Sequence, residues 1–322
     1  MRMISRNGLI FRIEDSGEAT LTECGQSAPV LELPAEIEGH ILTDVEPDAF
    51  DHCGPVEAFA VQAGCTSLRV WDGVLFDRTG VRLIRYPSGR TDREYMPPSG
   101  TGIIGFGAFS GAQALRSVLV PDGVHTVEGL AFADCAALEN MRLPLTLEKL
   151  GHEVFRGCLS LARVQIPAAH PFLRVEEGCL VDTEEETLLC CLPGTAGSEV
   201  TAPAGIRYVD DYAFYGCRDL EKVYLHHGLR TLGKYAFYHC GALKEVHLPE
   251  GVRSIGTRAF SGCVRLKSLY VPDSVTSIEY KAFNHCDQLT LAVNKGSYTE
   301  RYCRQFGFPY RHRIHWPWDK NA

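Results

Sequence analysis

The sequence has no run of apolar residues approaching the roughly 18 that a membrane-spanning helix needs. Its first residues, MRMISRNGLIF, lack the apolar stretch of roughly 7 to 15 residues found in secretion signals. Basic residues are not in excess, because 32 Lys and Arg face 40 Asp and Glu, for a net charge of -8. These absences predict a chain that is not inserted in a membrane and has no general affinity for nucleic acid.

Motifs of common enzymes are also missing. The sequence contains no glycine-rich dinucleotide or P-loop pattern, no serine-hydrolase G-x-S-x-G and no zinc-protease H-E-x-x-H. The histidines at 226, 227, 239 and 247 form the only cluster of that residue type, and we favour surface positions over a metal site for them. We therefore expect no enzyme activity, no metal and no cofactor.

Cysteine, in contrast, is abundant, with 13 in 322 residues. Many cysteines without a secretion signal predict reduced thiols and a cytoplasmic protein. If the N-terminus of the sequence had been trimmed, the alternative would be a cell-surface or secreted protein.

A five-residue motif centred near a phenylalanine recurs along the chain, for example AFADC at 131–135 and AFSGC at 259–263. Its phenylalanines are separated by 23 residues, or by 59 residues in two places, and a fixed period of this kind predicts a solenoid. The phenylalanines are Phe50, Phe109, Phe132, Phe155, Phe214, Phe237, Phe260 and Phe283.

Each five-residue motif is followed by the pattern L-x-x-V-x-L, and proline usually comes next, as in LENMRLP at 138–144. The alternation of apolar and polar residues predicts a half-buried strand, and proline ends it because it cannot donate to a sheet ladder. This 23-residue pattern resembles the leucine-rich repeats of the BspA (Treponema pallidum) type. The resemblance implies a leucine-rich-repeat solenoid, mostly β or α/β, with a parallel sheet on one face. Members of that family are mostly bacterial surface proteins that engage other proteins.

The residue three positions after each phenylalanine, here called the slot residue, is nearly always cysteine. Alanine fills the slot at Ala112, so a small apolar group is sufficient, and free cysteine behaves as a small buried hydrophobe. We therefore predict core positions, and neither metal ligands nor nucleophiles, for the slot cysteines Cys53, Cys135, Cys158, Cys217, Cys240, Cys263 and Cys286.

The two 59-residue gaps predict β-hairpins inserted near residues 66–100 and 171–205. Residues 65–100 hold six Arg and four acidic residues, whereas residues 170–205 hold one Arg and seven acidic residues. We interpret the charged ends of both hairpins as solvent-exposed tips. The alternative is that the two hairpins bind a partner. In the second hairpin, alternation along a strand should bury only one of Cys190 and Cys191, which would leave the other open to reaction.

We expect a single solenoid over residues 1–322, with an N-terminal cap at 1–46, repeats at 47–291 and a C-terminal cap at 292–322. A capping box of Ser297 and Glu300, with Gly307 beyond the last turn, predicts a short helix in the second cap. Trp316 and Trp318 in the tail should pack on the end of the solenoid or form an exposed aromatic patch.

The predicted function is the binding of a protein partner through the sheet-lined face. A structural spacer or an adhesin-like surface module is the alternative, and carbohydrate binding is a weaker one. Residues eight and ten after each phenylalanine should point away from the core in two columns, including Leu291 and Val293 in the last repeat. The candidate binding residues are Asn140, Arg142, Arg163, Gln165, Lys222, Tyr224, Glu245, His247, Ser268 and Tyr270.

Overall fold

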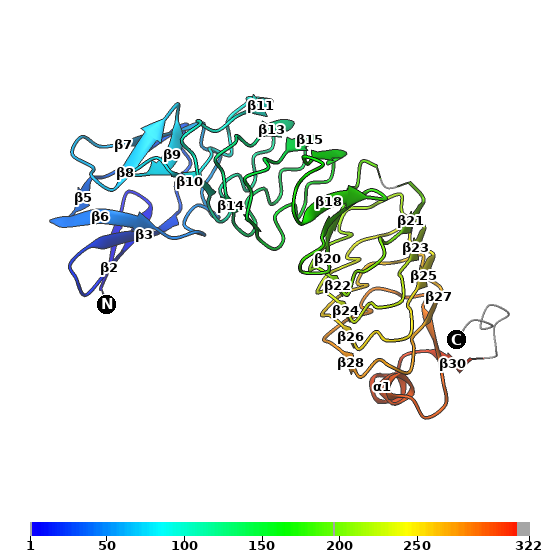
Figure 1. Ribbon diagram of the computed structural model, residues 1–322. Helices are drawn as coiled ribbons and strands as arrows, with labels where there is room; N and C mark the ends of the chain where they lie inside the picture. The colour runs from blue at the N-terminus through cyan, green and yellow to red at the C-terminus, as the bar shows by residue number, and fades with distance from the viewer. Residues whose placement is uncertain (1, 196, 314–322) are drawn as a thin grey trace. The chain divides into compact units, whose positions relative to one another are not determined.

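The computed structural model describes residues 2–195 and 197–313. The chain divides by its own contacts into two units, residues 1–167 and 168–322, each of which is described by itself. Both are leucine-rich-repeat solenoids made mostly of short parallel strands, with the single described helix, α1 (Tyr298–Phe306), near the C-terminus (Figure 1). The fold class is therefore the one that the sequence predicts.

Within each unit the L-x-x-V-x-L segments form a parallel sheet, which we call the motif sheet. In unit 1 it contains β11 (Glu94–Tyr95), β13 (Ser117–Leu119), β15 (Asn140–Arg142) and β17 (Arg163–Gln165). In unit 2 one part contains β21 (Glu199–Thr201), β23 (Lys222–Tyr224) and β25 (Glu245–His247). Another part contains β27 (Ser268–Tyr270), β29 (Thr290–Val293) and β30 (Tyr310–His312).

A second series of parallel strands, only two residues long, forms what we call the short-strand sheet. In unit 1 its members are β12 (Ile103–Ile104), β14 (Thr126–Val127) and β16 (Lys149–Leu150). In unit 2 they are β22 (Tyr208–Val209), β24 (Thr231–Leu232), β26 (Ser254–Ile255) and β28 (Ser277–Ile278). Figure 1 shows this series of unit 2 on the side of the coil away from β21, β23, β25 and β27. The sequence reading predicted strands on one face only.

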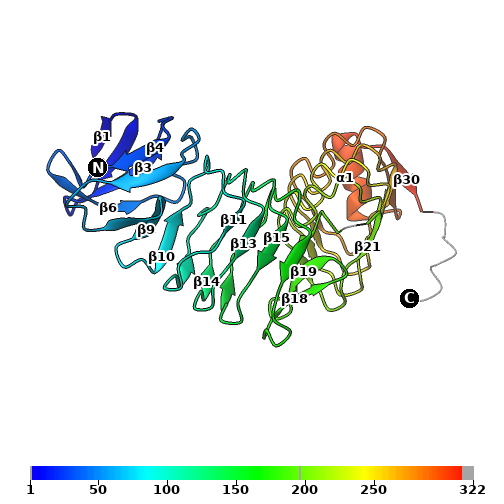
Figure 2. The same cartoon turned by 90° about the horizontal axis from the view of Figure 1, so that it is seen from above.

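The inserted hairpins extend the short-strand sheets. The first consists of β8 (Leu68–Trp71), β9 (Val74–Asp77) and β10 (Arg82–Arg85), and β10 pairs in parallel with β12. The second consists of β18 (Leu173–Glu176), β19 (Cys179–Asp182) and β20 (Thr187–Cys191), and β20 pairs in parallel with β22. In Figure 2, β9 and β10 lie beside the N-terminal strands of the same unit.

Several arginines of the first hairpin are engaged with the protein itself and are not simply solvated. The side chain of Arg85 is buried, donates to the carbonyl oxygen of Gly107 at 2.6 Å and lies over the ring of Phe50. Arg90 forms an ion pair with Asp72 at 2.6 Å.

The N-terminal strands form a mixed sheet in the order β1-β2-β3-β6-β5, made of β1 (Arg2–Arg6), β2 (Leu9–Ile13), β3 (Ala19–Cys24), β6 (His40–Val45) and β5 (Glu36–Ile37). Between them, β4 (Val30–Leu33) pairs in parallel with β7 (Ala58–Val61), the first motif strand. The N-terminal 46 residues therefore supply one parallel partner to the repeats as well as a mixed sheet at the N-terminal end.

The phenylalanines of the repeat stack into a buried ladder. Successive ring centroids lie 4.8 Å apart between Phe109 and Phe132, and 4.6 Å apart between Phe214 and Phe237. Tyr86, 23 residues before Phe109, occupies the ladder position of a repeat that contains the first hairpin, and its ring stacks on Phe109 at 5.1 Å. Cys191 occupies the corresponding position before Phe214, since its N–H bonds to the Ala213 carbonyl oxygen.

Six of the seven slot cysteines are buried free thiols, as predicted. Cys53 is the exception, because it forms a disulfide with Cys24, with the two Cα atoms 5.1 Å apart. The prediction of a free core thiol at Cys53 is therefore wrong. The cap strand β3 brings Cys24 beside the first slot, a contact that the repeat spacing could not reveal.

The last repeat is one residue shorter than the others between its phenylalanine and its strand. Leu269 of β27 therefore pairs with Leu291, eight residues after Phe283, and Tyr270 pairs with Ala292. Leu291 and Val293 are fully buried, so the prediction that they point away from the core is wrong.

Helix α1 closes the C-terminal repeats as the capping box predicts. The Ser297 hydroxyl accepts the N–H of Glu300, the Glu300 carboxylate accepts the N–H of Gly296 at 2.6 Å, and Gly307 ends the helix with φ 73°. The predicted packing of Trp316 and Trp318 concerns positions outside the described residues.

Candidate binding face

The four candidate residues of unit 1 lie on neighbouring motif strands and all are exposed. Asn140 is the register partner of Arg163, and Arg142 is the partner of Gln165. Between them Met141 and Val164 point into the core. Both guanidinium groups are exposed, and no described ion pair includes either of them.

The candidate residues of unit 2 are half-buried, and three of them contact one another. Tyr224 and His247 are register partners on β23 and β25, and their rings stack at 4.7 Å with an interplanar angle of 12°. His247 Nε2 lies 2.6 Å from Glu245 Oε1 on the same strand. The sheet geometry thus brings these three residues into one cluster, which we call the Tyr224 cluster.

An ion pair of Lys222 Nζ with Glu199 Oε1, at 2.7 Å, lies across the adjacent pair of strands. The hydrogen bond from this ammonium to Glu199 is the largest cause of the raised pKa of Lys222. Opposite charges in neighbouring strands hold these flexible side chains in place and give the face an alternating charge pattern.

Tyr270 lies farther along the motif sheet, and its ring stacks on neither Tyr224 nor His247 in the described contacts. The Arg313 guanidinium lies 4.2 Å from its ring centroid, and its hydroxyl donates to Glu250 Oε1 at 3.0 Å. Burial, together with the nearby Glu250, raises the pKa of Tyr270 to about 12. Its neighbour Ser268 accepts a hydrogen bond from Arg311 at 3.1 Å.

The sequence did not lead us to predict a second aromatic surface. It lies at the turns formed by the five-residue phenylalanine motifs. Tyr212 and Tyr235 stack at 4.7 Å, Tyr215 and Tyr238 lie 5.8 Å apart, and His239 contacts Tyr238 at 4.1 Å. The signal was present, since tyrosine stands two residues before and one residue after both Phe214 and Phe237.

The thiols and histidines of the described chain do not form a recognisable reaction centre. No group of three or more His, Cys, Asp or Glu in the described ranges could hold a metal ion. Of the adjacent pair in β20, Cys191 is buried and Cys190 is partly exposed, as the alternation predicts. Burial raises the pKa of the Cys190 thiol to about 12, which disfavours the reactive thiolate.

Comparison with known proteins identifies the family. The BspA-type leucine-rich repeat model matches residues 94–184 and 194–293 in six copies, which is more than half of the chain. The protein therefore belongs to the BspA-type leucine-rich repeat family, whose members are generally interaction or surface modules without enzyme activity. No curated protein sequence matches the chain.

Solved structures with similar folds include the following two. One is described as a leucine rich cell surface protein from Faecalibacterium prausnitzii A2-165, with 18% identity, a TM-score of 0.65, and 98% of this chain and 96% of that chain covered. The other is the pneumococcal vaccine antigen PcpA, with 20% identity, a TM-score of 0.65, and 92% and 82% covered. At these identities the likeness shows the fold alone. Within the described residues, no helix has the length and apolar character needed to cross a membrane.

Proposed function

We propose that this chain is a non-catalytic module that binds a protein partner through the motif sheet of unit 2, with the Tyr224 cluster as the centre of the contact. The observation that carries the proposal is the stacked pair of Tyr224 and His247 on a solvent-facing strand surface. A spacer would need only small or uniform side chains at these positions.

The cluster has the properties of an interface anchor. Tyrosine combines a large apolar ring with a polar end, and it is enriched where binding energy is concentrated. Stacking against His247, together with the bond from His247 to Glu245, restricts the rings before a partner arrives, so that less side-chain entropy is lost on binding. The charged side chains of Lys222 and Glu245 would contribute specificity and orientation.

Stacked aromatics could also serve a carbohydrate ligand, but a sugar ring needs an open aromatic face. The facing surfaces of Tyr224 and His247 are closed by their own stacking. The stack therefore leaves a sugar only the outer face of each ring, and does not by itself favour a carbohydrate over a protein partner.

We further infer that the protein works at the cell surface or after secretion, rather than in the cytoplasm expected from the sequence. The Cys24–Cys53 disulfide supports this location because disulfides persist in oxidising compartments. The free slot thiols are compatible with it, since burial protects them from oxidation. The description of the similar F. prausnitzii protein as a cell surface protein agrees with this proposal.

The test is site-specific photo-crosslinking with a benzoylphenylalanine residue at Ser268, applied to cell-surface and secreted protein fractions. We expect one dominant crosslinked protein, whose affinity falls at least about tenfold, or roughly 1.4 kcal/mol, in the double variant Tyr224→Ala with Tyr270→Ala. The matched control removes two tyrosines from the turn surface of the same unit, Tyr215→Ala with Tyr238→Ala. If the control variant weakens binding of the partner and the variant Tyr224→Ala with Tyr270→Ala does not, the proposed face is wrong.

A further inference from the structure

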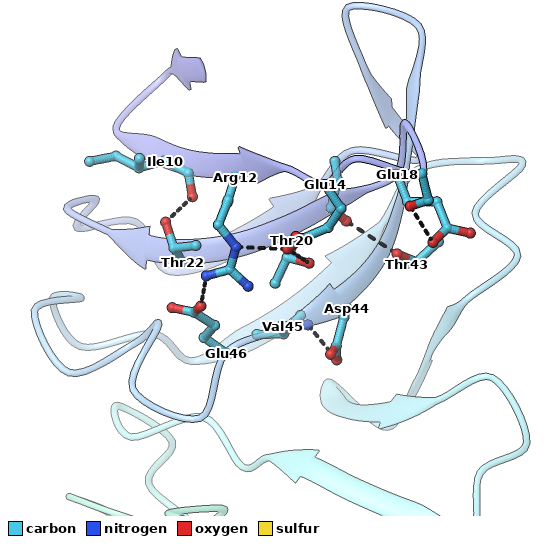
Figure 3. Close-up of polar contacts among 12 residues, drawn as sticks. Ile10, Arg12, Glu14, Glu18, Thr20, Thr22, Thr43, Asp44, Val45 and Glu46 are labelled. Atoms are coloured by element: carbon cyan, nitrogen blue, oxygen red, sulfur yellow. Dashed lines mark hydrogen bonds and ion pairs between the residues drawn. The ribbon is translucent and has the colours of Figure 1, made fainter. Parts of the chain in front are cut away.

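Unit 1 contains a cavity of about 280 Å³ between the end of β6 and the first hairpin, on a different unit from the Tyr224 cluster. Figure 3 shows the β6 side of this region, with Thr43, Asp44, Val45 and Glu46 in succession. The opposite wall comes from the start of β8 and from β9 and β10, and Gly105 and Phe106 complete it.

About half of the cavity wall is apolar. Phe50, Leu68 and Ile84 line it, and the ring of Phe106 remains 40% exposed beside it. An exposed aromatic ring at the mouth of a cavity can cover the alkyl part of a ligand and can also attract a cation through its face.

The charges that line the cavity are unevenly compensated. Glu46 is neutralised by Arg12, as Figure 3 shows, and Arg82 is neutralised by Glu128. Within the described residues, the exposed carboxylate of Asp44 accepts one hydrogen bond, from the backbone N–H of Val45 at 2.8 Å.

Asp77, on the facing hairpin, also lacks a cationic partner among the described residues. Its carboxylate accepts the Thr79 hydroxyl at 2.6 Å and the Arg82 N–H at 2.9 Å. Burial opposes ionisation of Asp77, but these hydrogen bonds outweigh it and lower the pKa, so the carboxylate is charged at neutral pH. Asp44 and Asp77 thus line the cavity without an ion-pair partner among the described residues.

We propose that this cavity binds an alkylammonium or alkylguanidinium group, the chemistry of a lysine or arginine side chain. The volume lies just below the range of pockets that enclose drug-sized ligands, and suits one extended side chain or a small free amine. An anion would be repelled by Asp44 and Asp77. A neutral apolar ligand would remove water from the two carboxylates without replacing it, which is unfavourable.

The experiment is a calorimetric and NMR titration of the full chain with three probes: capped lysine, capped norleucine as the uncharged analogue, and free butylamine. We expect capped lysine to bind at least about tenfold more tightly than capped norleucine. The affinity for capped lysine should fall as salt is added. Binding of capped lysine but not butylamine indicates a partner's side chain. Binding of butylamine alone indicates a free amine, and both results support the proposal.

The variant that carries the test is Asp44→Asn, because Asp44 makes only one local backbone bond and its loss should leave the fold intact. We expect this substitution to weaken the binding of capped lysine or butylamine at least about fivefold. The control Asp122→Asn, which changes an exposed carboxylate outside the cavity, should leave the binding unchanged. The proposal is overturned if both variants act equally, if capped norleucine binds and does so as tightly as capped lysine, or if no amine binds at concentrations up to about 10 mM.

Discussion

The thiol of Cys240 donates a hydrogen bond to the carbonyl oxygen of Phe214 at 3.1 Å, and the thiol of Cys263 makes the same bond to Phe237 at 3.2 Å. The contact recurs from coil to coil because the slot residue of one repeat lies under the phenylalanine of the repeat before it. It explains why cysteine, and not merely any small residue, predominates in the slot. The thiol supplies a weak donor as well as apolar volume.

The first prediction follows from this contact. Cys240→Ala should lower the free energy of unfolding by about 1–2 kcal/mol, because a buried sulfur and a weak hydrogen bond are lost together. Equilibrium denaturation measures the change. Cys190→Ala, at a partly exposed position of the same unit, is the control and should have a smaller effect. Equal losses in the two variants would contradict a special role for the slot.

The second prediction concerns the phenylalanine ladder. Phe132 is fully buried, with Phe109 stacked on it at 4.8 Å, so Phe132→Ala should cost about 3–5 kcal/mol of stability. Thermal or denaturant unfolding would measure the loss, which neighbouring coils should share. Phe106→Ala, which removes an exposed ring from the same unit, should cost clearly less. An unchanged midpoint for Phe132→Ala would show that the ladder does not hold the repeats together.

The third prediction is a thiol count. Under denaturing, non-reducing conditions, 11 cysteines should react, and Cys24 and Cys53 should become available only after reduction. Replacing both by serine should destabilise the N-terminal cap by about 3–4 kcal/mol, as expected for a closed loop of 29 residues. Mass mapping of the labelled peptides identifies the protected pair. Thirteen reactive thiols in protein purified from its native compartment would remove the main support for a surface location.

The sequence predicted the features that repeat, because a residue type at a fixed period reports a fixed environment. The buried ladder, the slot thiols and the motif strands all follow from the spacing of 23. Features that occur once were not accessible in this way. Cys24 pairs with Cys53 only because the cap folds against the first repeat, and Leu291 is buried because one residue is missing from the last coil.

Other features could not be recognised because a different residue type occupies the repeated position. Tyr86 and Cys191 stand 23 residues before Phe109 and Phe214 and complete the ladder through the hairpin insertions. The candidate residues on β15 and β17 are register partners, as are those on β23 and β25. The pairing of Tyr224 with His247 follows the 23-residue offset of the repeat. The contacts of Tyr270 with Glu250 and Arg313 lie outside that repeat and could not be predicted from it.

The last prediction concerns acid and the C-terminal cap. The Glu300 carboxylate accepts the Gly296 N–H and contacts His312 Nε2 at 2.9 Å, and these bonds lower the pKa of Glu300 to about 2 from its usual 4.5. A carboxylate whose pKa is lower in the folded state stabilises the fold fully above pH 4.5, and this contribution is lost as the pH falls from 4.5 toward 2. Glu300→Gln keeps an acceptor but removes the charge. The difference in thermal midpoint between wild type and Glu300→Gln should therefore be largest near neutral pH and shrink steadily below pH 4.5. Glu185→Gln, at the exposed tip of the second hairpin, should show little difference at any pH. A wild-type advantage that stayed constant down to pH 2 would mean that the Glu300 charge does not stabilise the cap.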